Sequence, residues 1–569
     1  MRKSDEKHQC DDGDMTRREF VGAGLLGGAA ALAGRHGPHL PGLTRAVAAE
    51  RPGALAPAPD PFELDEVTIS QLQDAMQSGK YTSRQITELY LARIGELDQS
   101  GPALNQVLET NPDALAIADA LDAERRAQKV RGPLHGIPIL LKDNIATADR
   151  MTTTAGSLAL DGCIAPRDAF VAARLRRAGA VLLGKTNMSE WANFRSTHST
   201  SGWSGRGGQG RNPYALDRTP SGSSSGSAAA TAANFVTAAI GTETDGSVVS
   251  PSAACSLVGI KPTLGLVSRT GIVPIAHSQD TAGPIARTVT DAAILLGALA
   301  GVDPHDASTA SSHGKAHTTY TRFLDVAGLR GARIGVARET FFGYSRVTDA
   351  LIESAIGVMR DQGAVIVDPA NIATAGKWGD SEYEVLLYEF KADLATYFAW
   401  LGSAAPMHSL ADVIAFNERH ADREMPFFGQ ETMLDAEKKG PLTSAAYRKA
   451  LAKNHRLTRT EGIDKVMLAH RLDALIAPTQ GPPGLIDLVN GDAGGGGSSS
   501  PAAVAGYPSI TVPAGYAFGL PVGLSFIGRA YTEPTLLRLA YAYEQASTAR
   551  RAPTFRDVTA LPDTGRPRG

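Results

Sequence analysis

Short apolar runs alternate with helical segments along most of this 569-residue chain. Each run is long enough for one strand, and its apolar residues are consecutive instead of alternating, which is typical of strands buried on both faces. A sheet made of such strands has to be covered by helices on both sides, so the sequence predicts an α/β fold. The predicted strands are residues 137–142, 179–186, 235–241, 332–337, 473–479, 509–514 and 522–528.

The N-terminal part of the chain differs from this pattern. Arg17 and Arg18 stand before a weakly apolar run that is rich in glycine and alanine. Small residues suited to cleavage follow at Ala48 and Ala49. This arrangement is typical of a twin-arginine export signal, and a disordered basic segment is the alternative interpretation.

An export signal would divide the chain into three parts. Residues 1–49 would direct transport by the twin-arginine machinery and be removed, and residues 50–62 would form a Pro-rich tether. Residues 63–560 are predicted to form a single domain, because no fixed-period repeat occurs in them. The mature protein is then expected to be exported, either to the periplasm or as a secreted protein, and both Met1 and Met15 remain possible starts.

Composition excludes several classes of partner. The net charge of −3 gives no basic field for nucleic acid. No apolar run reaches membrane-spanning length, so no membrane contact is expected once the signal is removed. The cysteines Cys10, Cys163 and Cys255 lack the spacing of metal ligands, and the sequence predicts neither a metal nor a cofactor. Whether Cys163 and Cys255 pair is left open.

Three short motifs match familiar patterns but stand in the wrong context. Residues 179–186 match a phosphate-binding loop, yet the four middle residues are Ala-Val-Leu-Leu, which predict a strand. Residues 205–210 match a dinucleotide-binding pattern, but no strand precedes them. Residues 222–226 match a nucleophile elbow centred on Ser224, but they follow a loop and not a strand. A Ser-His-Asp hydrolase with the α/β-hydrolase fold is therefore only an alternative.

Two turns are better candidates for chemistry. The turn SGSSSGS, residues 221–227, leads into the strong helix former AAATAAN, so its N–H groups lie at a helix N-terminus and could bind an anion. A flexible linker is the alternative. The strand predicted at 235–241 leads into TETDGS, at the edge where α/β sheets place ligands. The predicted oxyanion-hole donors are the backbone N–H groups of Thr244, Asp245, Gly246 and Ser247.

A serine nucleophile in this region needs a base, and no histidine stands nearby in the sequence. Upstream, the apolar run 137–142 ends in Lys142, which taken alone is most simply a solvated surface lysine. The combination of motifs argues against that, because it resembles the amidase signature family of serine hydrolases over roughly residues 65–550. The matching stretches are GIPILLKDNI, GKTNMSEWANF, TPSGSSSGSAAATAAN, GTETDGSVVSPSA, GLVSRTGIVPIAHSQDTAGPIARTVTDAA and GLPVGLSFIG.

The resemblance implies the amidase-signature fold, with a large mixed β-sheet covered by helices on both faces, and a Ser-Ser-Lys triad. By position, Lys142 matches the family's base, Ser223 its bridging serine after a cis peptide bond, and Ser247 its nucleophile. A lysine accepts a proton only when neutral, so the pKa of Lys142 has to fall from about 10.4 towards about 7–8, which burial can cause. The chain departs from the common pattern at Ser221, where many members have glycine. It also has Asp245-Gly246 in place of Gly-Gly, and the orientation of the Asp245 side chain is left open.

A finer resemblance is to the peptide amidase branch, whose members remove the C-terminal amide of peptides and release ammonia. Trp203, Ser224 and Tyr214 are then candidate substrate-binding residues, and residues 370–470 are expected to form an insertion beside the substrate channel. The expected partner is a peptide amide or another small amide. Three alternatives remain: a branch acting on simple aliphatic, aryl or fatty amides, the glutaminyl-tRNA amidotransferase subunit, and an exported non-catalytic binding homologue.

Overall fold

A computed structural model describes residues 62–558, and the predicted signal peptide lies outside the described residues. In the described part, eleven strands form one mixed sheet in the order β1-β3-β2-β6-β8-β7-β12-β13-β11-β9-β10. The pairs β2/β3, β2/β6, β9/β10 and β9/β11 are parallel, and the other neighbours are antiparallel. The strands are β1 (Val107–Thr110), β2 (Pro138–Lys142), β3 (Val181–Thr186), β6 (Ala238–Glu243), β7 (Val258–Lys261), β8 (Thr281–Ala286), β9 (Arg333–Val336), β10 (Val365–Val367), β11 (Ala474–Pro478), β12 (Ser509–Ala517) and β13 (Leu520–Ile527).

Every strand predicted from an apolar run is present in this sheet, as β2, β3, β6, β9, β11, β12 and β13. β6 begins later than predicted, because the Phe235 N–H bonds back to the Ala230 carbonyl at the end of the preceding helix. Residues 179–186 match the phosphate-loop pattern, but residues 181–186 form strand β3 and not a loop. The dinucleotide-like residues 205–210 fall in a small hairpin formed by β4 (Trp203–Ser204) and β5 (Gly208–Gln209).

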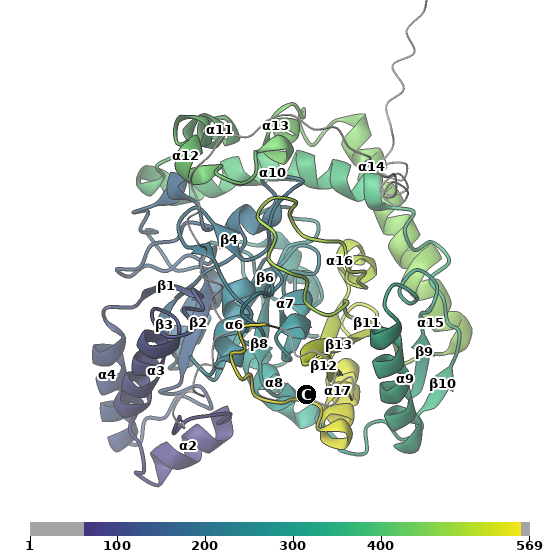
Figure 1. The fold of residues 1–569 in the computed structure, drawn as a ribbon, viewed down its shortest axis with the longest axis horizontal. Coiled ribbons are helices and arrows are strands. Elements are labelled where there is room, and N and C mark those ends of the chain that lie inside the picture. The colour runs from purple at the N-terminus through teal and green to yellow at the C-terminus, as the bar shows by residue number, and fades with distance from the viewer. Residues whose placement is uncertain (1–61, 559–569) are drawn as a thin grey trace, which may run out of the picture. The chain divides into compact units, whose positions relative to one another are not determined.

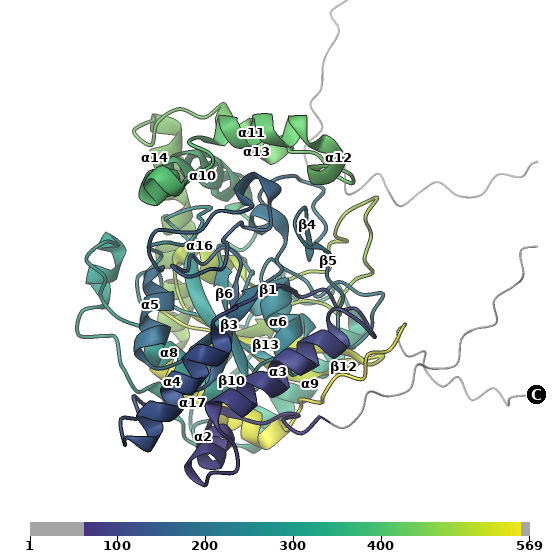
Figure 2. The same ribbon diagram turned by 90° about the vertical axis from the view of Figure 1, so that its left-hand side faces the viewer.

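Helices cover both faces of the sheet, as Figures 1 and 2 show. α6 and α7 contact each other and the sheet, while α8, α9 and α17 form a second group that also contacts the sheet. α2 begins with the predicted capping box, in which Thr68 and Gln71 bond to each other's backbone N–H groups. These helices are α2 (Ile69–Gln77), α3 (Ser83–Leu97), α4 (Ala114–Arg126), α5 (Phe170–Arg177), α6 (Ser225–Ala232), α7 (Val249–Ala254), α8 (Val289–Leu299), α9 (Arg346–Asp361), α16 (Ser500–Ala505) and α17 (Glu533–Ser547).

Most of residues 370–470 form a helical layer at one end of the sheet. α10, α11, α13 and α14 lie together at the top of both views (Figures 1 and 2). α10 is the longest of them and contacts α11, α13 and α14. The layer consists of α10 (Gly379–Leu401), α11 (Leu410–Arg419), α12 (Ala421–Glu424), α13 (Glu431–Glu437) and α14 (Ala445–His455). The last helix of the segment, α15 (Asp464–His470), lies outside the layer, lower in Figure 1.

Most of the buried residues between these layers are hydrophobic, and two of them are cysteines. Cys163 and Cys255 are both buried and unpaired, so they form no disulfide. Among residues 62–558, no helix combines the length and the apolar character that crossing a membrane would require.

Candidate active site

Lys142 is the last residue of β2, and its side chain is fully buried, at 0% exposed. Its Nζ donates to Ser223 Oγ at 2.7 Å, to Thr242 Oγ1 at 3.0 Å and to the Thr242 carbonyl at 3.2 Å. β2 and β6 are parallel neighbours, which brings Thr242 beside the lysine. Burial lowers the pKa of Lys142 to about 7, although the nearby carboxylates of Asp280 and Glu243 oppose the shift. Lys142 is therefore not a surface lysine.

Ser223 lies in the turn that leads into α6, and it is fully buried. The peptide bond between Gly222 and Ser223 is cis, as the family resemblance implies. A side chain at Gly222 would collide with Ser189 Oγ, which explains the glycine. The next residue, Ser224, points to strand β6 and not to a ligand: its Oγ donates to the Thr242 carbonyl at 3.0 Å and accepts from the Thr242 N–H at 3.1 Å. We therefore assign Ser224 a structural contact in place of the predicted substrate contact.

Ser247 lies in the loop between β6 and α7 and is 7% exposed. Its carbonyl accepts the Ser224 N–H at 3.1 Å, which places this loop beside the turn that carries Ser223. The Ser247 hydroxyl makes no hydrogen bond within the described part of the chain. The structure thus brings together three residues singled out in the sequence: Lys142 and Ser223 through a direct hydrogen bond, and Ser247 through the backbone of the neighbouring turn.

The loop before Ser247 is held by a residue that the sequence interpretation missed. The buried carboxylate of Glu243 accepts the N–H groups of Gly246 at 2.9 Å, Val248 at 2.8 Å and Val249 at 3.0 Å. The Gly246 N–H is therefore engaged, which corrects its prediction as an oxyanion donor. Within residues 62–558, the N–H groups of the other three predicted donors, Thr244, Asp245 and Ser247, have no partner, so they remain available. Gly246 has a φ of +81°, which glycine adopts readily.

The side chain of Asp245, whose orientation the sequence leaves open, turns towards the helical layer. One of its oxygens accepts the Ser500 hydroxyl, and its carboxylate faces Glu382 of α10. Burial and the charge of Asp245 hold the pKa of Glu382 well above its usual range. Gln279 Nε2 donates to Glu382 Oε1 at 3.1 Å and to the Thr244 carbonyl at 3.3 Å. The nucleophile loop is thereby attached to α10.

A second missed residue, Asp280, also supports this loop. Its Oδ1 accepts the Thr244 hydroxyl at 2.6 Å, and its Oδ2 accepts the N–H groups of Ile275 and Ala276 at 2.8 and 2.9 Å. Burial raises the pKa of Asp280 to about 6. Thr244, predicted as an oxyanion donor, therefore has its side chain fixed from a separate part of the chain.

The two aromatic residues predicted to bind substrate are packed in the interior. Trp203 is 4% exposed and lies edge-on to Phe427 and Phe428, with ring centroids 5.8 and 5.0 Å away. Tyr214 is 6% exposed, and its hydroxyl donates to the Arg551 carbonyl. We therefore place both side chains in the packing of the protein and not in a substrate pocket, because both rings pack against other aromatic rings and the Tyr214 hydroxyl already has a partner.

Comparison with known proteins gives consistent matches over most of the chain. The family model described as Amidase matches residues 85–537. A probable amidase of Arabidopsis thaliana is 43% identical over 503 residues, covering 87% of this chain and 92% of that protein. A glutamyl-tRNA(Gln) amidotransferase subunit of Halorhodospira halophila is 36% identical over 512 residues, covering 85% of this chain and 98% of that protein. The crystal structure of native peptide amidase from Stenotrophomonas maltophilia matches with a TM-score of 0.84 at 52% identity, covering 87% of this chain and 100% of that chain.

Proposed function

Because this chain belongs to the amidase signature family and is an amidase, we propose that it hydrolyses its substrate through a Ser-Ser-Lys triad of Lys142, Ser223 and Ser247. The observation that carries the proposal is the 2.7 Å hydrogen bond from Lys142 Nζ to Ser223 Oγ in a fully buried site. A lysine with a pKa of about 7 is neutral in a large fraction of molecules at neutral pH. It can then act as a general base, which an ordinary lysine cannot.

In this mechanism Ser247 is the nucleophile. Its Oγ attacks the carboxamide carbon, its proton passes to Ser223 Oγ, and the proton of Ser223 passes to Lys142 Nζ. The same path returns a proton to the leaving nitrogen, so that ammonia departs and an ester forms on Ser247. Water then attacks the ester with the same proton transfers in reverse, which releases the acid and restores the serine.

The oxyanion of the tetrahedral intermediate needs hydrogen-bond donors that are already in place. The N–H groups of Thr244, Asp245 and Ser247, which have no partner among the described residues, are suited to this role. Glu243 contributes indirectly, because three of its hydrogen bonds fix the backbone on either side of Ser247. Glu243 is therefore a positioning residue and not a donor.

The substrate we propose is the C-terminal amide of a peptide. Two observations support it: the similarity to the peptide amidase of Stenotrophomonas maltophilia, and the helical layer of residues 370–470, which contacts the nucleophile loop through Glu382 and is the proposed wall of the substrate channel. A terminal carboxamide has a small leaving group, so nothing needs to extend beyond Ser247 on that side. An internal peptide bond would need room for chain on both sides.

A short amidated peptide is therefore expected to be converted to the free acid with its internal bonds intact. Mass spectrometry would show only the change from a terminal NH₂ to OH, and an assay would show an equal amount of ammonia. The same peptide with a free carboxylate is the control and should be unchanged. Internal fragments, or an intact peptide amide beside rapid hydrolysis of simple aliphatic, aryl or fatty amides, would assign the enzyme to another branch. No hydrolysis of any amide would favour a non-catalytic homologue.

We further propose that the protein is exported by the twin-arginine machinery to the periplasm or the medium. The proposal rests on Arg17, Arg18 and the weakly apolar run after them, which lie outside the described residues. The RNA-linked reaction of the amidotransferase subunit takes place in the cytoplasm, so export would place this enzyme in a different compartment.

Changing Arg17 and Arg18 together to lysine is expected to leave uncleaved precursor in the cytoplasm, because the twin-arginine pair is the recognised feature while the charge is kept. Fractionation followed by N-terminal sequencing measures this. Exported wild-type protein should begin close to residue 49 or 50. Extracytoplasmic protein that still begins at Met1 or Met15 would contradict a cleavable signal.

A further inference from the structure

Two carboxyl groups face each other where the nucleophile loop meets α10. Asp245 stands two residues before Ser247, and Glu382 lies in the first turn of α10, with its side chain against that of Asp245. The common family pattern has glycine at position 245, so this pair depends on a residue by which the chain departs from that pattern. Two ionised carboxylates in contact repel each other, so one of the two groups is expected to be neutral.

The hydrogen bonds around the pair show where a proton is needed. Asp245 Oδ2 accepts the Ser500 hydroxyl, and Glu382 Oε1 accepts from Gln279 Nε2 at 3.1 Å. Asp245 Oδ1 is buried and has no donor among the described residues. An ionised carboxylate can only accept hydrogen bonds, whereas a protonated one can also donate. A proton on Glu382 Oε2 therefore supplies the donor that Asp245 Oδ1 lacks.

The surrounding charges also favour a proton on Glu382. Burial and the negative charge of Asp245 hold the pKa of Glu382 well above its usual range. Beside it, α14 places the uncharged Asn454, which donates to the carbonyl of the preceding residue at 3.3 Å. Lys261 of β7 and Glu243 of β6 are the charged groups that act on Asp245 from the sheet. The positive charge of Lys261 favours the ionised form of Asp245, so Glu382 is the neutral partner.

We propose that Glu382 is a positioning residue, which is protonated in the active enzyme and holds the nucleophile loop by donating a hydrogen bond to Asp245. This inference rests on the proposed function, in which Ser247 is the nucleophile. The backbone N–H of Asp245 is also a donor of the proposed oxyanion hole. A shift of Asp245 would therefore move an oxyanion donor and the nucleophile together, although Glu382 itself does not touch the reacting atoms.

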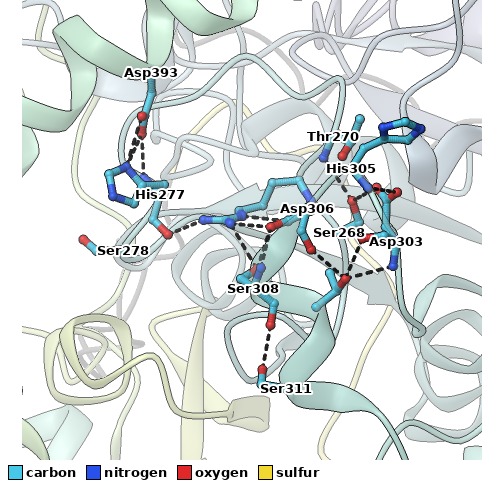
Figure 3. A network of polar contacts seen from close by, with 12 residues as sticks. Ser268, Thr270, His277, Ser278, Asp303, His305, Asp306, Ser308, Ser311 and Asp393 are labelled. Atoms are coloured by element: carbon cyan, nitrogen blue, oxygen red, sulfur yellow. Dashed lines mark hydrogen bonds and ion pairs between the residues drawn. The ribbon is translucent and has the colours of Figure 1, made fainter.

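α10 is held in place independently of this pair. Asp393, about three turns after Glu382, accepts the backbone N–H of His277 at 2.8 Å and lies 2.9 Å from His277 Nδ1, as Figure 3 shows. Glu389 accepts the Ser278 N–H at 2.9 Å. Loss of the proton would bring two negative charges into contact. Because α10 is fixed at these further points, the resulting displacement should fall on the nucleophile loop, and activity should decrease.

The pH dependence of kcat tests this, with any amide that the enzyme hydrolyses as the substrate. In the wild type, kcat should fall at a pH above the rise that belongs to Lys142, because Glu382 then loses its proton. Glu382→Gln should lack this fall, since its amide donates to Asp245 at every pH and still accepts from Gln279. Glu382→Leu cannot donate, so its kcat should be about 10-fold lower even at the optimum, and Glu382→Gln should restore most of that loss.

Infrared difference spectroscopy detects the proton without relying on activity. The spectrum of the wild type minus that of Glu382→Gln, taken at neutral pH, should contain the band of a protonated carboxyl group. This band should disappear over the pH range in which kcat falls. Melting temperatures measured at each pH show whether the protein is still folded there.

Glu389→Gln is the matched control, since Glu389 is a buried glutamate on the same helix that contacts the loop 269–281 and not the nucleophile loop. It should lower the melting temperature but keep the alkaline fall. The proposal is overturned if the wild type shows no such fall, if Glu382→Gln keeps it, if the infrared band is missing, or if Glu389→Gln removes the fall equally. An alkaline fall that Glu382→Gln removes, without the rise through about 7, would instead contradict Lys142 as the base.

Discussion

Replacing Ser247 by alanine is expected to reduce turnover by about 10⁴-fold or more, because no acyl-enzyme can form without the nucleophile. Labelling by a serine-directed phosphonate should be lost at the same time. Ammonia release and mass spectrometry of the intact labelled protein measure the two effects separately. The fold should be retained, because the Ser247 hydroxyl makes no hydrogen bond within the described residues.

Ser252→Ala is a matched control for this variant. Ser252 lies on α7, five positions further along, and its buried hydroxyl has no partner among the described residues. Its removal should leave activity, labelling and melting temperature near the wild-type values. Full activity in Ser247→Ala, or a loss in Ser252→Ala as large as that in Ser247→Ala, would show that the nucleophile is assigned wrongly. Inactivation by substitution of a single histidine would favour the Ser-His-Asp alternative.

Replacing Lys142 by methionine is expected to reduce kcat by about 10³-fold, within the range that a general base contributes. Methionine fills a similar volume but cannot accept the proton from Ser223. Lys142→Arg should be equally impaired, because a guanidinium still donates to Ser223 but does not lose its proton. The pH dependence separates chemistry from packing. In the wild type, kcat/KM should rise as pH increases through about 7, where Lys142 becomes neutral, and this rise should be absent from the residual activity of both variants.

Lys185→Met shows what the loss of a buried lysine does outside the triad. Lys185 lies on the neighbouring strand β3, is equally buried, and donates to the Ile145 carbonyl at 2.8 Å and to Thr153 Oγ1 at 2.7 Å. Its replacement should lower the melting temperature but leave the activity of the folded fraction and the pH profile near the wild type. If Lys142→Met keeps the wild-type pH profile, Lys142 is not the base.

The sequence predicts those parts of the fold that depend on local pattern. The continuous apolar runs correspond to real strands, and the capping box at Thr68 begins α2 as expected. β8 escapes prediction because its sequence, TAGPIA, contains both glycine and proline, which are depleted in strands. It is a strand because β6 and β7 pair with it from both sides. Tertiary pairing, and not local preference, makes that element.

The residues of the candidate site also differ in whether the local sequence could predict them. The residues of the proposed triad could be found because they stand in recognisable motifs, and the family to which those motifs point is confirmed by the family model. Asp280 also stands in one of those motifs, but its role could not be predicted from it, since its contact with Thr244 joins positions 36 apart that only the folded chain brings together. Nor could the sequence show that the Gly246 N–H is taken by Glu243, only three residues away. A count of available donors requires knowing where each carboxylate points.

The two unpaired thiols have a consequence for how this protein can fold. Cys163 and Cys255 are buried at separate places in the fold, and neither is cross-linked. Folding of residues 62–558 therefore requires no disulfide formation and no oxidant. This property is compatible with the proposed twin-arginine route, which carries folded proteins, because a chain that needs no disulfide can be folded before transport.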